Sequence, residues 1–169
     1  MIQKYVLLRF YVANPIRNNV ANCKVISQKE YDDLKDKTEN YLIKDKNNYK
    51  FMLNNFKNVK RLGAKVLTID TALSKILTRW LRINQSGYFF TLNDKVTPIT
   101  SNHVTKLLNS IFKKYAEGKK VSTSALRHIQ ITNDLKGEPT IKQKEEKEKK
   151  IEDKYQHSSA MNDTYRKID

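Results

Sequence analysis

The chain has 169 residues, a length that suits one ordinary domain with a hydrophobic core. Its 33 lysines and arginines outnumber 18 aspartates and glutamates, which gives a formal net charge of +15. This excess favours a polyanionic partner, because neutralising phosphates releases condensed counterions, while charge alone leaves open a basic protein with no nucleic-acid role. The single cysteine, Cys23, excludes a disulfide framework and a zinc site built from cysteines, and it indicates a small buried hydrophobe.

The sequence carries no signal for export or membrane insertion. No apolar run approaches the roughly 20 residues that span a bilayer. The opening segment has too short an apolar stretch and too early an arginine, Arg9, for a signal peptide. A single cysteine also fits a reducing compartment. We therefore expect an intracellular protein, whether nuclear, cytoplasmic or viral, that is neither secreted nor bound to a membrane.

The first part of the chain predicts a buried helix followed by mixed structure. Apolar residues recur at helical spacing before Asn14-Pro15, where the helix should stop. These residues are Val6, Leu7, Phe10 and Tyr11. Residues 14–27 then indicate a turn, a short helical turn and the entry to a strand, and the polar residues 27–40 indicate a surface helix or loop.

Three strands are predicted next, at residues 41–44, 49–53 and 64–69. A turn at residues 45–48 joins the first two, and a basic turn at residues 56–63 joins the second and third. Together they predict a small three-stranded antiparallel sheet with three cations at the tip of the basic turn. These cations are Lys57, Lys60 and Arg61.

Helical patterns return in the second half of the chain. An apolar face covers residues 73–81, residues 87–92 form a short apolar connector, and the clearest helical stripe covers residues 104–115. Thr100 or Ser101 is able to cap that last helix. The expected fold class is therefore α+β, mainly α-helical, with one small antiparallel sheet.

One more helix should begin near Ser122 or Thr123. We expect it to carry three apolar residues, and Arg127, which lies beside two of them, should be partly buried and partnered. These apolar residues are Leu126, Ile129 and Leu135. Residues 136–150 are highly charged and predict a loop that leads into a solvated helix with little contribution to the core.

Four short segments carry residues suited to cleaving a DNA strand with a tyrosine. A tyrosine that attacks a phosphodiester in line builds negative charge on the phosphoryl oxygens, which two guanidinium forks hold well. A lysine supplies the proton that the departing sugar oxygen needs, and an imidazole assists the phosphate or the phenol, whose reference pKa is about 10. This set needs no metal or cofactor. In chain order the segments are Pro15-Ile16-Arg17-Asn18, the basic turn at Lys57, Leu126-Arg127-His128-Ile129, and His157-Ser158-Ser159 followed by Tyr165.

The order of these segments resembles the catalytic domain of tyrosine recombinases, the phage-type integrases. That family has an LRH-type box on a helix, then GHS, then a tyrosine eight or nine residues on. Its first arginine follows a hydrophobic helix, as Arg17 does here, and its lysine lies on a β-hairpin, as Lys57 does. The details look closest to integrase-like recombinases of large DNA viruses or their parasites.

The resemblance implies a role for each matching residue. Tyr165 would form a 3′-phosphotyrosyl bond, Arg17 and Arg127 would hold the scissile phosphate, and Lys57 would protonate the leaving oxygen. The histidine His157 would support the phosphate or the nucleophile. The remaining roles are a lesser phosphate contact for Ser124, bracing of the helix for His128, and DNA contacts for Lys60 and Arg61.

The chain also departs from the family pattern. Ser124 stands where the family often has a histidine, and serine donates a hydrogen bond without carrying charge. Gln156 replaces the usual glycine before the last histidine, which indicates a different turn. We interpret residues 1–169 as one catalytic domain, with the charged connector at residues 136–150, and we expect the family's N-terminal core-binding domain to be absent.

The expected function is site-specific DNA recombination or integration, although each residue alone is weak support. Lys57 in particular has rivals in Lys60 and Arg61. The expected partner is double-stranded DNA, with self-association on DNA and weak or no self-association away from it. Two alternatives stay open: a non-catalytic DNA-binding module with the same fold, and an enzyme like a type IB topoisomerase.

Overall fold

The structure, a computed structural model, describes residues 2–46, 48–113, 115–116, 118–135, 146, 148–151 and 154. The α-helices are α1 (Ile2–Ala13), α2 (Gln28–Asp32), α3 (Val59–Leu62), α4 (Thr71–Ile83), α5 (Ser101–Phe112) and α6 (Thr123–Leu135). The 3-10 helix is η1 (Asn18–Val20), and the strands are β1 (Lys24–Ser27), β2 (Asn40–Asp45), β3 (Asn48–Leu53) and β4 (Lys65–Thr68). The predicted fold class, α+β and mainly helical, is confirmed.

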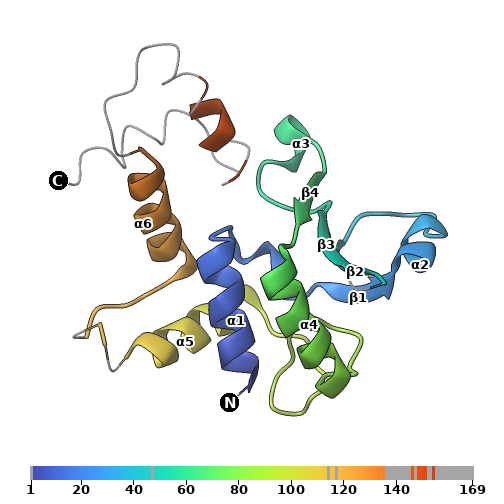
Figure 1. The fold of residues 1–169 in the computed structure, drawn as a ribbon, viewed down its shortest axis with the longest axis horizontal. Coiled ribbons are helices and arrows are strands. Elements are labelled where there is room, and N and C mark those ends of the chain that lie inside the picture. Colours follow the sequence, from blue (N-terminus) through green and yellow to red (C-terminus); the bar gives the residue numbers. More distant parts are fainter. Residues whose placement is uncertain are drawn as a thin grey trace.

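Helix α1 is the central element of the molecule. It packs against α4, α5 and α6, and Figure 1 shows it between α6 on one side and α4 on the other. Its four predicted core residues are all buried. The helix ends where predicted, because the Asn14 amide donates to the Phe10 carbonyl at 2.8 Å and Pro15 has no amide hydrogen to continue the ladder.

The sheet has the order β1-β2-β3-β4. Strands β2, β3 and β4 are antiparallel, as predicted, and their bounds differ from the predicted ones by one residue or less at most ends. The predicted sheet had three strands, whereas the structure has a fourth: β1 pairs with β2 in parallel, with Lys24 opposite Tyr41. The sequence indicated only a strand entry there, because a parallel partner is chosen by the crossover between the strands, and local alternation does not encode it.

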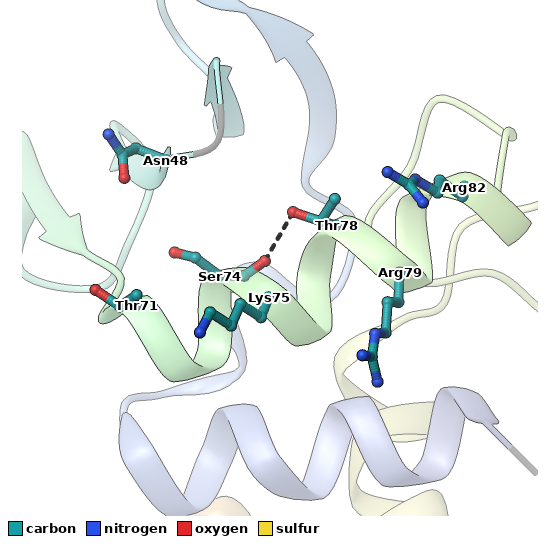
Figure 2. Close-up of a pocket in the computed structure, with 7 residues that line it drawn as sticks. All are labelled: Asn48, Thr71, Ser74, Lys75, Thr78, Arg79 and Arg82. Atoms are coloured by element: carbon teal, nitrogen blue, oxygen red, sulfur yellow. Dashed lines mark hydrogen bonds between the residues drawn. The ribbon is translucent and has the colours of Figure 1, made fainter.

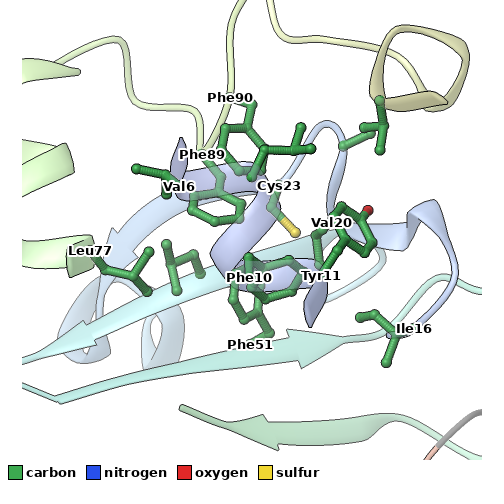
Figure 3. Packing of buried hydrophobic residues seen from close by; sticks show 14 of the residues in the cluster. Val6, Phe10, Tyr11, Ile16, Val20, Cys23, Phe51, Leu77, Phe89 and Phe90 are labelled. Atoms are coloured by element: carbon green, nitrogen blue, oxygen red, sulfur yellow. The ribbon is translucent and has the colours of Figure 1, made fainter. Parts of the chain in front are cut away.

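Three phenylalanine rings join α1 to the sheet and to the connector before α5 (Figure 3). The ring centroid of Phe10 lies 5.2 Å from Phe51 of β3 and 5.6 Å from Phe89, and Phe51 and Phe89 are 5.1 Å apart. Tilted and edge-on rings at these distances add to the stabilisation that burial gives. The apolar connector predicted at residues 87–92 is therefore part of the core.

The last three helices begin at polar caps. The Leu73 amide donates to Asp70 Oδ1 at 2.7 Å at the start of α4, and the predicted cap Thr100 accepts from the His103 amide at the start of α5. Serine 122 accepts from the Ala125 amide at 3.2 Å at the start of α6. These side chains satisfy amide hydrogens that a helix leaves free in its first turn.

Two features were not predicted from the sequence. Ile129 is 59% exposed, and the buried face of α6 is instead formed by Thr123, Arg127 and Ile131, which are spaced four residues apart and lie on one side of the helix. The basic turn at residues 56–63 contains the one-turn helix α3. Within the described ranges, no helix is both long enough and apolar enough to span a bilayer.

Candidate active site

Arg17 lies in the loop that leaves α1. The preceding residue, Ile16, is buried in the core, and Arg17 takes an extended conformation just before η1. Its Nε atom is buried and has no hydrogen-bond acceptor among the residues that the structure describes. Because a guanidinium stays charged at all ordinary pH values, such an N–H is available to an anion.

The 3-10 helix that follows Arg17 is bonded to α5. The Asn18 side chain donates to the Ser101 carbonyl at 3.0 Å and to Thr105 Oγ1 at 3.4 Å. These contacts connect segments more than 80 residues apart in the chain and limit how far the Arg17 loop can move.

Lys57 lies in the turn between β3 and α3, and its side chain is exposed. The buried ring of Phe56 packs in the core directly before it. Lys60 and Arg61 are exposed on α3 itself, so the three predicted cations share one short surface segment. Gly63 ends α3 at a φ of 69°, a conformation that favours glycine.

Asn40 joins the Arg17 and Lys57 segments. Its side chain is 8% exposed, and its Nδ2 donates to the carbonyls of Asn19 and Asn55, both at 2.7 Å. Its Oδ1 accepts from the Asn55 amide at 2.8 Å. Asn19 follows Arg17 by two residues and Asn55 precedes Lys57 by two, so one side chain sets the spacing of both segments. We call this arrangement the Asn40 bridge.

The Asn40 bridge was not found from the sequence. Its partners lie 15 and 21 residues away, and no periodic pattern connects them to an asparagine at the start of a strand. In the sequence, Asn40 ends the polar segment 27–40, where an amide side chain is expected to be exposed and gives no signal of a buried role.

Arg127 is buried on α6, as predicted, with 4% of its surface exposed. Its Nη2 donates to Ser124 Oγ at 3.3 Å, so the hydroxyl predicted to be a lesser phosphate contact lies beside the guanidinium. This helix face packs on α1, so the guanidinium lies at the contact between the two helices. His128, expected to brace the helix, is half-buried at the next position.

Figure 1 shows how these segments are arranged. The loop that leaves α1 lies between α6 and the β4–α3 side of the sheet. Contacts of η1 with β2 and α5, and of α1 with α6, agree with this view. The structure thus joins the Arg17 and Lys57 segments through Asn40, and it packs α6, which carries Arg127, on α1, which leads into Arg17.

The two remaining predicted residues, His157 and Tyr165, lie outside the described residues, as does Gln156. The last described residue before them is Lys154, whose Nζ forms an ion pair with Asp134 Oδ2 of α6 at 3.1 Å. Ile151 is buried close by. Ile151 and Lys154 therefore lie against the helix that carries Arg127.

Burial changes the pKa of two groups near α1. It raises the pKa of the Tyr11 phenol well above its ordinary value, and the nearby Cys23 adds to this effect. It also raises the pKa of the Cys23 thiol. A fully buried phenol that resists ionisation does not serve as a nucleophile, and the buried thiol is the inert hydrophobe that the sequence predicted.

Comparison with known proteins identifies the fold. No family model matches the sequence, and no curated protein matches it. A solved structure, the crystal structure of XerA recombinase, is similar with a TM-score of 0.61 at 15% identity, and the match covers 99% of this chain and 52% of that one. The shared fold is that of a recombinase. At this identity the likeness shows the fold alone, and the chain spans about half the length of the XerA structure.

Proposed function

We propose that this chain cleaves and rejoins DNA as a tyrosine recombinase, with Tyr165 as the nucleophile. The observation that carries the proposal is the placement of Arg17 and Arg127 within a recombinase fold. One has a buried N–H with no described acceptor, the other is buried on a helix face, and their elements are packed together through α1. The buried N–H of Arg17 favours binding of an anion, and α6 brings a second guanidinium to α1.

The proposed chemistry follows from these groups. The Tyr165 oxygen gives up its proton to a base, for which His157 is the candidate, and attacks the scissile phosphorus; a bond forms between them, and the bond from phosphorus to the 5′ oxygen breaks. Arg17 and Arg127 neutralise the charge that grows on the phosphoryl oxygens, and Lys57 gives the leaving oxygen a proton. His157 supports the phosphate or the phenol, with Ser124 as a lesser contact. Rejoining is the reverse attack by a 5′ hydroxyl on the 3′-phosphotyrosyl bond.

Exposed cations extend this site toward DNA. Lys60 and Arg61 lie on α3, just beyond Lys57, where they would contact the backbone beside the scissile phosphate. We propose double-stranded DNA as the partner, bound with self-association of the chain on it, because strand exchange joins ends from two duplexes.

A strand-trapping experiment tests the proposal. On a nicked duplex whose cleaved fragment diffuses away, the protein should accumulate as a covalent protein–DNA adduct. The adduct should disappear in Tyr165→Phe and persist in Tyr155→Phe, a matched control ten residues earlier. An adduct that forms equally in Tyr165→Phe rules out this nucleophile.

A second function, DNA binding without cleavage, is favoured by one observation. The net charge of +15 and the exposed segment of Lys57, Lys60 and Arg61 bind a phosphate backbone whether or not chemistry follows. Binding to duplex DNA with no covalent product on any nicked substrate would establish this function in place of the first. Relaxation of a supercoiled plasmid by the chain alone would instead indicate a topoisomerase.

A further inference from the structure

A groove lies between α4 and the turn that joins β2 to β3 (Figure 2). Its volume is about 380 Å³, and the described residues that line it include no aspartate or glutamate. They do include hydroxyl, amide and cationic side chains. The residues used below are Asn48, Ser74, Lys75, Thr78, Arg79 and Arg82.

Ser74 contributes a hydroxyl donor to this groove. The residue is 4% exposed, and its Oγ has no hydrogen-bond partner among the described residues. Figure 2 shows this hydroxyl pointing into the space between α4 and Asn48. A buried hydroxyl without a partner is costly, so an acceptor bound in the groove would stabilise it. Thr78 beside it is held in place, because its Oγ1 lies 3.2 Å from the Tyr49 hydroxyl and donates to the Ser74 carbonyl.

Three cations form a row along the same helix. Lys75, Arg79 and Arg82 are exposed, and none of them forms an ion pair with a described residue. Their spacing of four and three residues places them over about 10 Å of helix axis, at 1.5 Å per residue. One strand of DNA carries a charge about every 3.4 Å along its axis, so the row matches about three phosphates. A single bound phosphate would use only part of it.

The groove is separate from the candidate active site. Asn48 begins β3, whereas Lys57 follows the far end of that strand. Six extended residues place these two ends about 17 Å apart. DNA bound in the groove would therefore contact the chain at a different position from DNA bound at the Arg17 and Lys57 segments.

We propose that this groove binds the phosphodiester backbone of DNA as a second contact, which holds the duplex at a distance from the cleaved phosphate. The inference rests on the proposed function, since it takes DNA as the substrate of the same chain. The guanidiniums of Arg79 and Arg82 bind phosphate oxygens, and the Ser74 hydroxyl donates to one of them.

Matched charge removals test the proposal on the full chain. The double variant Arg79→Gln, Arg82→Gln is compared with Lys29→Gln, Lys35→Gln, two exposed lysines on and just after α2. Affinity for a duplex is measured by anisotropy over a range of salt. The slope of log affinity against log salt should fall by about 1.8 in the groove variant, at about 0.9 per phosphate contact, and much less in the control. Equal slopes in the two variants overturn the proposal.

Ser74→Ala is the second variant. It should bind duplex DNA about tenfold more weakly, the effect of losing one hydrogen bond to a charged group. Its thermal stability should not fall, because the hydroxyl has no partner in the folded protein. If Ser74→Ala binds DNA with wild-type affinity, the proposal is wrong. It is also wrong if pyrophosphate binds in the groove and the affinity for DNA does not change.

The failure of this inference is distinguishable from the failure of the proposed function. The control variant Lys29→Gln, Lys35→Gln should form the Tyr165 adduct to the wild-type extent, because neither lysine belongs to the groove or to the candidate active site. If the groove variants bind DNA with wild-type affinity and the wild-type protein forms the adduct, only the groove proposal is wrong. If the groove variants bind DNA more weakly and no protein forms the adduct, the groove proposal is supported and strand cleavage by Tyr165 is rejected.

Discussion

Replacing Asn40 with alanine removes all three hydrogen bonds of the Asn40 bridge. Each bond contributes about 1 kcal/mol net, and the exposed side of Asn55 lets water replace part of the loss. The free energy of unfolding should therefore fall by about 2–3 kcal/mol in a urea titration followed by circular dichroism. For a chain of this size the midpoint temperature should fall by roughly 4–12 °C.

The same substitution should slow cleavage in the protein that remains folded. Without the bridge, the Arg17 and Lys57 segments are no longer held at one spacing, and a displacement of about 1 Å in a reacting group costs up to 100-fold in rate. We expect adduct formation on a nicked duplex to slow by roughly 10- to 100-fold at a temperature well below unfolding, with DNA affinity little changed.

Asn54→Ala is the matched control for this prediction. Its side chain makes one exposed hydrogen bond, to the Glu39 carbonyl at 2.9 Å, and it belongs to the same loop. Its loss should cost about 0.5–1 kcal/mol and leave the rate of adduct formation unchanged. If Asn40→Ala resembles Asn54→Ala in both measurements, the reasoning about the bridge is refuted.

Three further predictions concern single positions. Arg127→Lys keeps the charge but loses the planar fork, so adduct formation should fall by about 100-fold in a strand-trapping assay, and a rate within threefold of wild type would contradict a phosphate contact. Ile131→Ala should lower the free energy of unfolding in urea by about 2–4 kcal/mol, whereas Ile129→Ala should change it by less than about 0.5, and the reverse order would contradict the assigned face of α6. The pKa of the Cys23 thiol is raised in the fold, so the free energy of unfolding should fall as pH rises through the ordinary thiol pKa of about 8.5. Iodoacetamide should label Cys23 only in urea, and rapid labelling of the native protein would contradict its burial.

The parts of the fold that depend on local spacing were predictable. The apolar repeat of α1, the alternation of β3 and the cap at Thr100 all arise from residues a few positions apart, and each matches the structure. The buried face of α6 was not predictable in this way, because it is decided by where α1 lies. The choice between Ile129 and Ile131 therefore required the tertiary structure.

The same distinction between local and tertiary information applies to the candidate site. Arg17, Lys57 and Arg127 were predicted from motifs, and their roles stay predictions; the structure adds that Asn40 joins the first two segments and that α6 packs on α1. Asn40 was missed because its partners are distant in the chain. His157 and Tyr165 remain predictions from the sequence, and the strand-trapping experiment addresses the tyrosine directly.

The three-ring contact of Phe10, Phe51 and Phe89 has a consequence for synthesis of the chain on the ribosome. The apolar face of α1 is made first, but its last aromatic neighbour is added 79 residues later. At about 5–20 residues per second this interval lasts roughly 4–16 s. During that time the apolar face of α1 lacks at least one of its partners, so this face is exposed to chaperone capture or premature aggregation.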